Sequence, residues 1–146
     1  MPRRNVIWLN GTFDVLHMGH IKLLERAHEI ACDELPALSW EIIVGVDTDE
    51  RVREKKGNNR PVNTLANRMD FLRAIRYVDT VLPFGTDREL EELIMLNRPR
   101  FMVIGDDYRD KKIIGEEYIE KIVYQERYDG LSSSNIINGT YKTSYL

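Results

Sequence analysis

The stretch VIWLNGTFDVLHMGHIKLLERAHEIA, residues 6–31, joins an apolar run to an amphipathic run through a segment with two glycines. Val6–Leu9 is apolar and contains β-branched and aromatic residues, which predicts a buried strand. The apolar residues that follow repeat with helical spacing, at Ile21, Leu23, Leu24, Ala27, Ile30 and Ala31. A strand that leads directly into a helix predicts the first half of a βαβ unit.

The same alternation continues along the chain. Further strand-length apolar runs are Trp40–Val46, Thr80–Pro83, Phe101–Ile104 and Lys121–Tyr124. Helical spacing recurs at Leu65, Met69, Leu72 and Ile75, and again at Leu90, Leu93, Ile94 and Leu96. Strands that are apolar on both faces and alternate with helices form parallel sheets covered by helices. The sequence therefore predicts an α/β fold with a doubly wound, mostly parallel five-stranded sheet flanked by helices, whose ligands bind beyond the carboxyl ends of the strands.

Length and charge narrow the class of protein. The 146 residues predict one domain, with residues 139–146 as a frayed or packing tail. A formal net charge of -3 gives no global attraction for nucleic acid, so we expect no nucleic-acid partner. The single cysteine, Cys32, cannot form an intramolecular disulfide, and the N-terminus lacks a signal-peptide pattern. The cysteine count and the N-terminus lead us to expect a cytoplasmic protein. No apolar run is long enough to cross a bilayer, so we expect no membrane partner.

The loop NGTFDVLHMGH, residues 10–20, carries the candidate chemistry. Gly11 permits a tight turn, and Gly19 removes a side chain where the helix begins, so a ligand can approach the backbone. The start of a helix attracts phosphate through its unpaired N–H groups. His17 and His20 are three residues apart and can point to one side, so both imidazoles can meet the same phosphate.

Two other interpretations of these histidines stay open. They can be turn or capping residues, since histidine is common at helix ends. They can also form a zinc site with His28 and Cys32, although the spacing matches neither C-x-x-C nor H-E-x-x-H. A metal assay separates the second interpretation from the phosphate site.

The segment GTFDVLHMGHIKLLERA, residues 11–27, resembles the signature of the cytidylyltransferase-like nucleotidyltransferases. These are small, Rossmann-like α/β enzymes with an H-x-G-H motif that transfer a nucleotidyl group to a phosphorylated alcohol or sugar. Three further segments follow in the family's order: RPVN with NRM at 60–63 and 67–69, IGDDY at 104–108 and DGLSSSNI at 129–136. The resemblance therefore covers most of the chain.

The resemblance implies a set of site residues. The residues implied to be catalytic are His17, His20, Lys56 with Lys55 as its alternate, and Arg68. Those implied to bind the nucleotide are Gly11, Thr12, Phe13, Asp14, Gly19, Asp106, Arg127, Ser132, Ser133 and Ser134. The Mg²⁺ ion is expected to arrive with the triphosphate and to have no direct protein ligand, with Asp14 as its candidate contact through water. A homodimer is expected as well.

Each of these residue types also has a plain structural interpretation. The three serines, which precede a short apolar helix, form either a second phosphate cradle or N-caps. Lys55 and Lys56 either close over a triphosphate or form a solvated basic run. Arg68 and Arg127 either contact the nucleotide or form ion pairs on the surface. Asp106 and Asp107 follow a strand, where they suit a ribose hydroxyl, a second substrate, Mg²⁺ or a helix cap.

The implied reaction is attack by a substrate phosphate on the α-phosphorus of a nucleoside triphosphate, with release of pyrophosphate. RPVN, IGEE at 114–117 and the segment 129–137 resemble heptose 1-phosphate adenylyltransferase domains, which we favour. GHIKLLERA at 19–27, IRYVD at 75–79 and GDD at 105–107 resemble glycerol-3-phosphate cytidylyltransferases. The stretch 32–39 is longer than in either group. A nucleotide sensor without turnover is a further alternative, whereas the length argues against a fragment of a class I aminoacyl-tRNA synthetase.

Overall fold

A computed structural model describes residues 4–34, 39–126 and 136–138 of the chain. Its strands are β1 (Arg4–Gly11), β2 (Glu41–Asp47), β3 (Thr80–Phe84), β4 (Pro99–Gly105) and β5 (Lys121–Gln125). They form one sheet in the order β3-β2-β1-β4-β5, and every pairing between neighbours is parallel. The predicted α/β fold with a five-stranded parallel sheet is confirmed.

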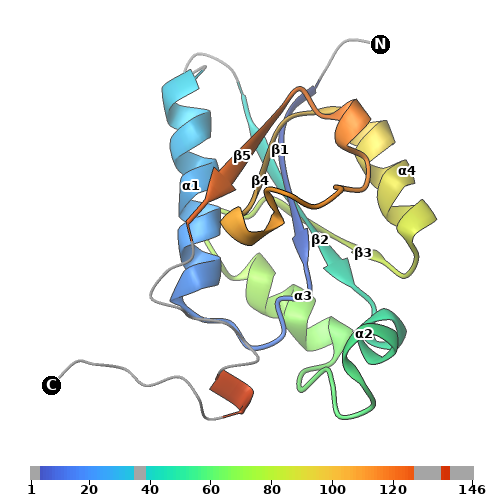
Figure 1. The fold of residues 1–146 in the computed structure, drawn as a ribbon. Helices are drawn as coiled ribbons and strands as arrows, with labels where there is room; N and C mark the ends of the chain where they lie inside the picture. Colours follow the sequence, from blue (N-terminus) through green and yellow to red (C-terminus); the bar gives the residue numbers. More distant parts are fainter. Residues whose placement is uncertain (1–3, 35–38, 127–135, 139–146) are drawn as a thin grey trace, which may run out of the picture.

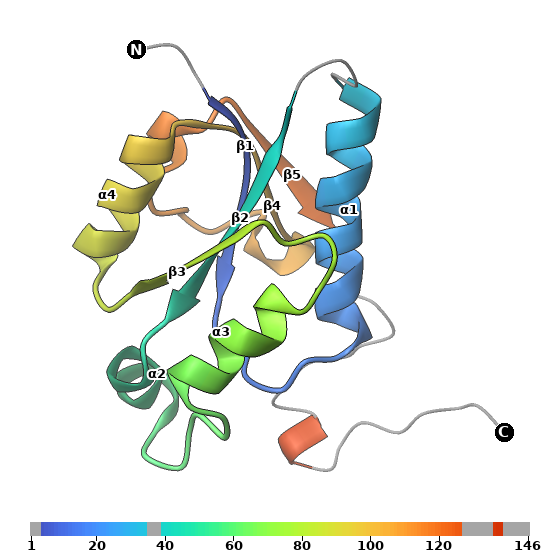
Figure 2. The same cartoon turned by 180° about the vertical axis from the view of Figure 1, so that it is seen from behind.

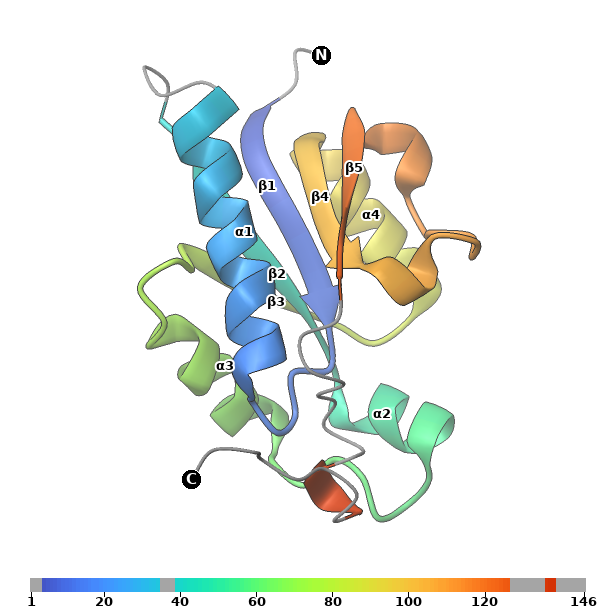
Figure 3. The same ribbon diagram turned by 60° about the vertical axis from the view of Figure 1, so that its left-hand side comes forward.

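Helices cover both faces of this sheet. They are α1 (Met18–Glu34), α2 (Asp49–Lys56), α3 (Leu65–Arg73) and α4 (Asp87–Asn97), with short 3-10 helices η1 (Asp106–Tyr108) and η2 (Glu116–Tyr118). Figures 1 and 3 show α1 and α3 on one side of the strands and α4 on the other. The short helix α2 lies beyond the strand arrowheads, beside the start of α3 (Figure 2).

The continuous apolar run in β1 follows from its central position. Ile7 and Leu9 belong to the core on the α1 side, and Val6 and Trp8 belong to the core on the α4 side. All four are at most 1% exposed, and burying each contributes about 1.5–3 kcal/mol to stability. Gly45 on the neighbouring strand makes room for Trp8, because a Cβ atom at position 45 would lie 2.8 Å from the indole Cζ2.

Parallel strands bring their carboxyl ends to one edge of the sheet. The chain builds the sheet outward from β1 to β3 on one side and then adds β4 and β5 on the other. The crevice where a doubly wound sheet binds its ligand therefore lies beyond the ends of β1 and β4. We call the edge of the sheet at which the parallel strands end the carboxyl edge. Among the described residues, no helix is long and apolar enough to span a membrane.

Candidate active site

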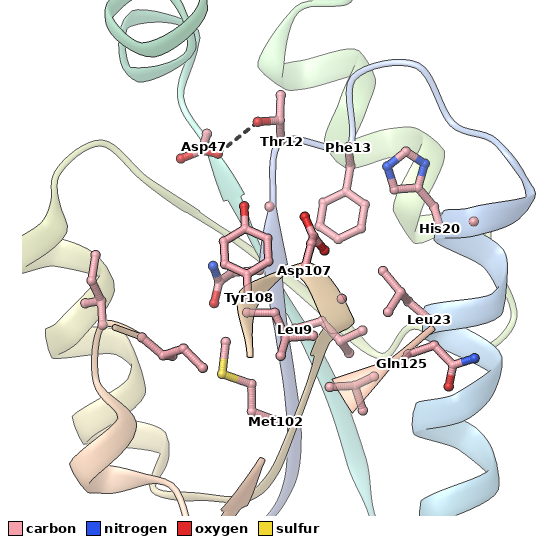
Figure 4. A pocket seen from close by; sticks show the side chains of 18 of the residues that line it. Leu9, Thr12, Phe13, His20, Leu23, Asp47, Met102, Asp107, Tyr108 and Gln125 are labelled. Atoms are coloured by element: carbon pink, nitrogen blue, oxygen red, sulfur yellow. Dashed lines mark hydrogen bonds between the residues drawn. The ribbon is translucent and has the colours of Figure 1, made fainter. Parts of the chain in front are cut away.

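A pocket of about 680 Å³ opens at the carboxyl edge (Figure 4). Its wall comes from the end of β1 and the loop after it, the start of α1, the end of β2 with α2, and the segment after β4. Predicted site residues that line it are Gly11, Thr12, Phe13, His17, Gly19, His20, Lys55 and Lys56. The structure thus brings together the two histidines and both lysines, which are far apart in the sequence.

Backbone hydrogen bonds orient the two imidazoles. The His17 N–H donates to His20 Nδ1 at 3.2 Å, and the Gly19 N–H donates to His17 Nδ1 at 3.0 Å. Because each Nδ1 accepts a hydrogen bond, a neutral ring carries its proton on Nε2. The ring centroids are 4.0 Å apart. His17 therefore caps α1 and also lines the pocket, so the capping interpretation and the phosphate interpretation are compatible.

This arrangement changes what the helix start offers to a phosphate. The sequence predicts an approach to bare backbone around Gly19, but its N–H group already donates to His17. An imidazole Nε2–H can take the place of that backbone donor. The His17 and His20 side chains thus carry hydrogen-bond donors from the start of α1 into the pocket.

His20 is held in its neutral form. Burial is the main cause that lowers its pKa to about 3, and the neighbouring charges of His17 and Lys56 lower it further. A neutral imidazole donates one hydrogen bond without carrying positive charge. Lys55 and Lys56 line the same pocket and bring basic side chains beside it.

Lys55 and Lys56 lie at the end of α2, whose position is fixed by Arg51. The Arg51 guanidinium donates to Asp47 Oδ1 at 2.6 Å and to Asp87 Oδ1 at 2.7 Å, which ties α2 to β2 and to the start of α4. Burial lowers the pKa of Lys56, and Arg60 and Lys55 act in the same direction. Such a lysine gains from an anionic ligand, because a nearby negative charge favours its protonated form.

The turn after β1 places Thr12 and Phe13 beside the histidines. The Thr12 hydroxyl donates to Asp47 Oδ2 at 3.0 Å, and the Phe13 ring lies 5.3 Å from that of His20. Phe13 has a φ of 51°, in the left-handed region. A Cβ atom at Gly11 would come within 3.3 Å of the Phe13 ring, so the glycine leaves space for this ring at the pocket wall.

Arg68 lies behind the pocket and does not line it. Its side chain is fully buried and donates to the carbonyl oxygens of Thr12 at 2.9 Å and Asp47 at 2.8 Å. It also donates to the Asn63 carbonyl and to the carboxylate of Asp49. The predicted phosphate contact is not what the structure shows, because these bonds point the guanidinium at the backbone under the site.

Asp14 is also turned away from the predicted position. Its carboxylate is buried and accepts from the backbone N–H groups of Val62 at 2.7 Å and Asn63 at 2.8 Å. It also pairs with Arg60, with 3.4 Å between Nε and Oδ2. These bonds give the RPVN segment its role, which is to tie the loop before α3 to the turn after β1. Asp14 does not line the pocket wall, where it would need to be to contact Mg²⁺ through water.

Of the two adjacent aspartates after β4, Asp107 lines the pocket and Asp106 does not. Asp106 accepts from the Arg109 guanidinium at 2.9 Å on the surface. Successive residues of a 3-10 helix point to different sides, so only one of the pair reaches the pocket. Figure 4 shows Asp107 and Tyr108 directed into it.

Residues 8–139 match the family model described as cytidylyltransferase-like. The chain belongs to the cytidylyltransferase-like family. It is 39% identical over 135 residues to the bifunctional protein HldE of Campylobacter fetus subsp. fetus, which covers 92% of this chain and 28% of that protein. HldE of Helicobacter hepaticus is 35% identical over 143 residues, covering 98% of this chain and 28% of the relative. The chain thus spans little more than a quarter of the length of these curated relatives.

A solved structure has the same fold. The lipopolysaccharide core biosynthesis protein from Thermoplasma volcanium GSS1 superposes with a TM-score of 0.65 and 23% sequence identity, covering 85% of this chain and 98% of that chain. The prediction of a cytidylyltransferase-like nucleotidyltransferase is confirmed by the family match and the fold together.

Part of the predicted site of this cytidylyltransferase-like chain lies outside the described residues. Arg127, Ser132, Ser133 and Ser134 belong to this part, and their roles at the nucleotide remain predictions. Residues 35–38 of the long segment before β2 and the tail at 139–146 are outside it as well.

Several residues of the pocket were not predicted. Asp47, Arg51, Tyr108 and Lys112 line it together with Asp107. Asp47 is the last residue of β2, so the rule that ligands bind at the carboxyl ends of strands was the signal that could have found it. Nothing local marks Lys112, which reaches the pocket only through the path of the chain after η1.

The described residues place no group of three or more His, Cys, Asp or Glu side chains where it could hold a metal ion. His28 and Cys32 contact each other on an exposed part of α1, at 3.6 Å between Nε2 and Sγ. Asp47 and Asp107 are carboxylates in the pocket wall, and Mg²⁺ usually binds to one or two carboxylates together with phosphates. A Mg²⁺ ion that arrives with a triphosphate would meet these carboxylates, of which Asp47 already accepts from Thr12 and Arg51.

Proposed function

We propose that this chain is a heptose 1-phosphate adenylyltransferase domain. It would transfer AMP from ATP to the phosphate of the sugar and release pyrophosphate. The observation that carries the proposal is the cluster at the start of α1, where His17 and His20 lie in one pocket with Lys55 and Lys56. The identity to HldE proteins and the resemblance of RPVN and of residues 114–117 to heptose 1-phosphate adenylyltransferase domains support the choice of substrates.

The proposed chemistry needs no general base. A phosphate monoester carries a charge of about −1.5 to −2 at neutral pH and is already a nucleophile. The site must instead stabilise the charge on the α-phosphate and on the leaving pyrophosphate. The Nε2–H groups of His17 and His20 would donate to the α-phosphate oxygens, and Lys56 would supply positive charge beside them. Bound Mg²⁺ would supply further charge neutralisation on the triphosphate.

The working conditions of the enzyme belong to the same proposal. It would act in the cytoplasm as a homodimer with Mg²⁺ as the metal of the ATP substrate. Sedimentation velocity measures the oligomeric state, and omission of Mg²⁺ from the assay measures the metal requirement. A monomeric active species would overturn the dimer without affecting the reaction.

Pyrophosphate release tests the substrates directly. ATP and CTP are each incubated with Mg²⁺ against heptose 1-phosphate and glycerol 3-phosphate. Turnover with ATP and heptose 1-phosphate supports the proposal, and turnover restricted to CTP and glycerol 3-phosphate replaces it with the cytidylyltransferase alternative. Nucleotide binding without turnover in any combination replaces it with a sensor.

Histidine variants test the site. We expect His17→Ala or His20→Ala to lower kcat by about 10²–10⁴, the usual cost of losing one such stabiliser. His28→Ala, which alters an exposed histidine of the same helix, is the matched control and should keep wild-type turnover. Near-wild-type kcat in the His17 and His20 variants would remove these residues from the mechanism.

A further inference from the structure

The pocket is lined by residues from both faces of the sheet. The part beside α1, which we call the α1-side lobe, is lined by Phe13, His20, Leu23 and Gln125. The part toward α4, which we call the α4-side lobe, is lined by Phe84, Leu90, Met102, Tyr108, Lys112 and Ile113. In Figure 4, Asp107 lies between Phe13 on one side and Tyr108 on the other. The two lobes meet at the end of β4.

The reaction needs two directions of approach. Transfer of a nucleotidyl group places the attacking oxygen and the leaving oxygen roughly in line on opposite sides of the phosphorus. If the start of α1 holds the triphosphate, the acceptor phosphate approaches from the opposite side, and its carbon skeleton extends into the α4-side lobe.

The α4-side lobe suits a sugar ring. Its floor is apolar and belongs to the core on the α4 side, in which Phe84, Met102 and Ile113 are buried. Tyr108 is 44% exposed at the rim and presents a hydroxyl group beside an aromatic ring. A cyclic sugar has one C–H face that can cover such a floor and hydroxyl groups that reach a polar rim. An acyclic three-carbon acceptor has no ring face to cover it.

Lys112 is the cation of this lobe. Arg51 also lines the pocket, but Asp47 and Asp87 already neutralise its charge. Among the ion pairs of the described residues, none involves Lys112. It comes from the segment between η1 and η2, whereas Lys55 and Lys56 belong to α2. We infer that the α4-side lobe binds the ring of a cyclic sugar phosphate and that Lys112 determines acceptor affinity by donating a hydrogen bond to it; this inference rests on the proposed function.

Steady-state kinetics of pyrophosphate release test the inference. Lys112→Gln should raise the KM for heptose 1-phosphate about tenfold or more, because a charge-assisted hydrogen bond is lost. The KM for ATP should stay within about twofold, since the triphosphate lies in the other lobe. Lys112→Arg keeps the charge and should recover much of the acceptor affinity.

The neighbouring lysine provides a matched control. Lys111→Gln changes the charge of the same segment by the same amount, but Lys111 does not line the pocket and instead stands 5.0 Å from the Tyr108 ring centroid. It should leave both KM values within about twofold. An equal rise in acceptor KM for both variants would show long-range attraction in place of contact, and a rise in the KM for ATP alone would assign the lobe to the nucleotide.

A binding measurement separates this inference from the proposed function. If wild-type protein turns over no acceptor, the proposed function fails, and calorimetric titration of heptose 1-phosphate in the presence of a non-hydrolysable ATP analogue tests the lobe alone. Binding that is about tenfold weaker in Lys112→Gln than in wild type supports the assignment. Equal binding by the two proteins, or no binding by wild type, overturns it.

Discussion

Acidification should destabilise this fold through His20. The pKa of His20 is lowered from 6.5 to about 3 by burial and by the charges of His17 and Lys56. The folded protein therefore binds this proton more weakly than the unfolded chain, and the effect is absent above the unfolded pKa of 6.5. Stability falls as the pH drops below that value and stops falling below about 3. Between pH 7 and pH 5, the linkage amounts to about 2 kcal/mol.

Urea unfolding at pH 7 and pH 5 measures this loss, with tryptophan fluorescence, to which the fully buried Trp8 contributes, as the signal. The comparison is between wild type and His20→Gln, because glutamine keeps a polar side chain that does not titrate. Wild type should lose about 2 kcal/mol more than His20→Gln on going to pH 5. His28→Gln is the control for a general histidine effect and should behave as wild type. An equal loss in wild type and His20→Gln would refute the assignment of a buried, neutral His20.

Three further outcomes follow from the geometry. Arg68→Met should destabilise the fold by about 3 kcal/mol in urea unfolding, because buried carbonyls lose their donor, whereas the exposed Arg73→Met should change stability by less than about 0.5 kcal/mol. Gly45→Ala should cost about 1–3 kcal/mol, since its Cβ would lie 2.8 Å from Trp8, and unaltered stability would contradict the packing. The pKa of Lys56 is lowered, so kcat/KM should fall with rising pH already below pH 10.5, as this lysine loses its proton. Lys56→Arg should move this alkaline fall in kcat/KM to higher pH, because arginine keeps its proton. A fall at the same pH in the variant would assign it to another group.

The order of elements could be predicted because the strands of this sheet are buried on both faces. Val6–Leu9 is apolar at every position since alternate side chains enter different cores, and such a run is visible in the sequence. The ends of the strands are harder to predict from the sequence. Strand β1 extends from Arg4 to Gly11. Arg4 pairs with β4, and Asn10 and Gly11 pair with β2, which a hydropathy pattern does not show.

The histidine motif could be predicted because its geometry is local. His17 and His20 are oriented by backbone groups within three residues of them. Arg68 and Asp14 could not be placed in this way. Asp14 pairs with Arg60, 46 residues away, and Arg68 donates to Thr12, 56 residues away. The sequence therefore indicates charged residues near the site but not the direction in which they point.

The buried guanidinium of Arg68 also fixes the polarity of the backbone in front of it. In a trans peptide, the carbonyl and the following N–H point in opposite directions. Since the Thr12 carbonyl is drawn toward Arg68, the N–H of Phe13 faces away from it. The fully buried Arg68 thus sets the direction of the peptide dipole between Thr12 and Phe13, in the loop that precedes the histidines. Substitution of Arg68 would disturb the direction of the Phe13 N–H donor, although every side chain that lines the pocket would be unchanged.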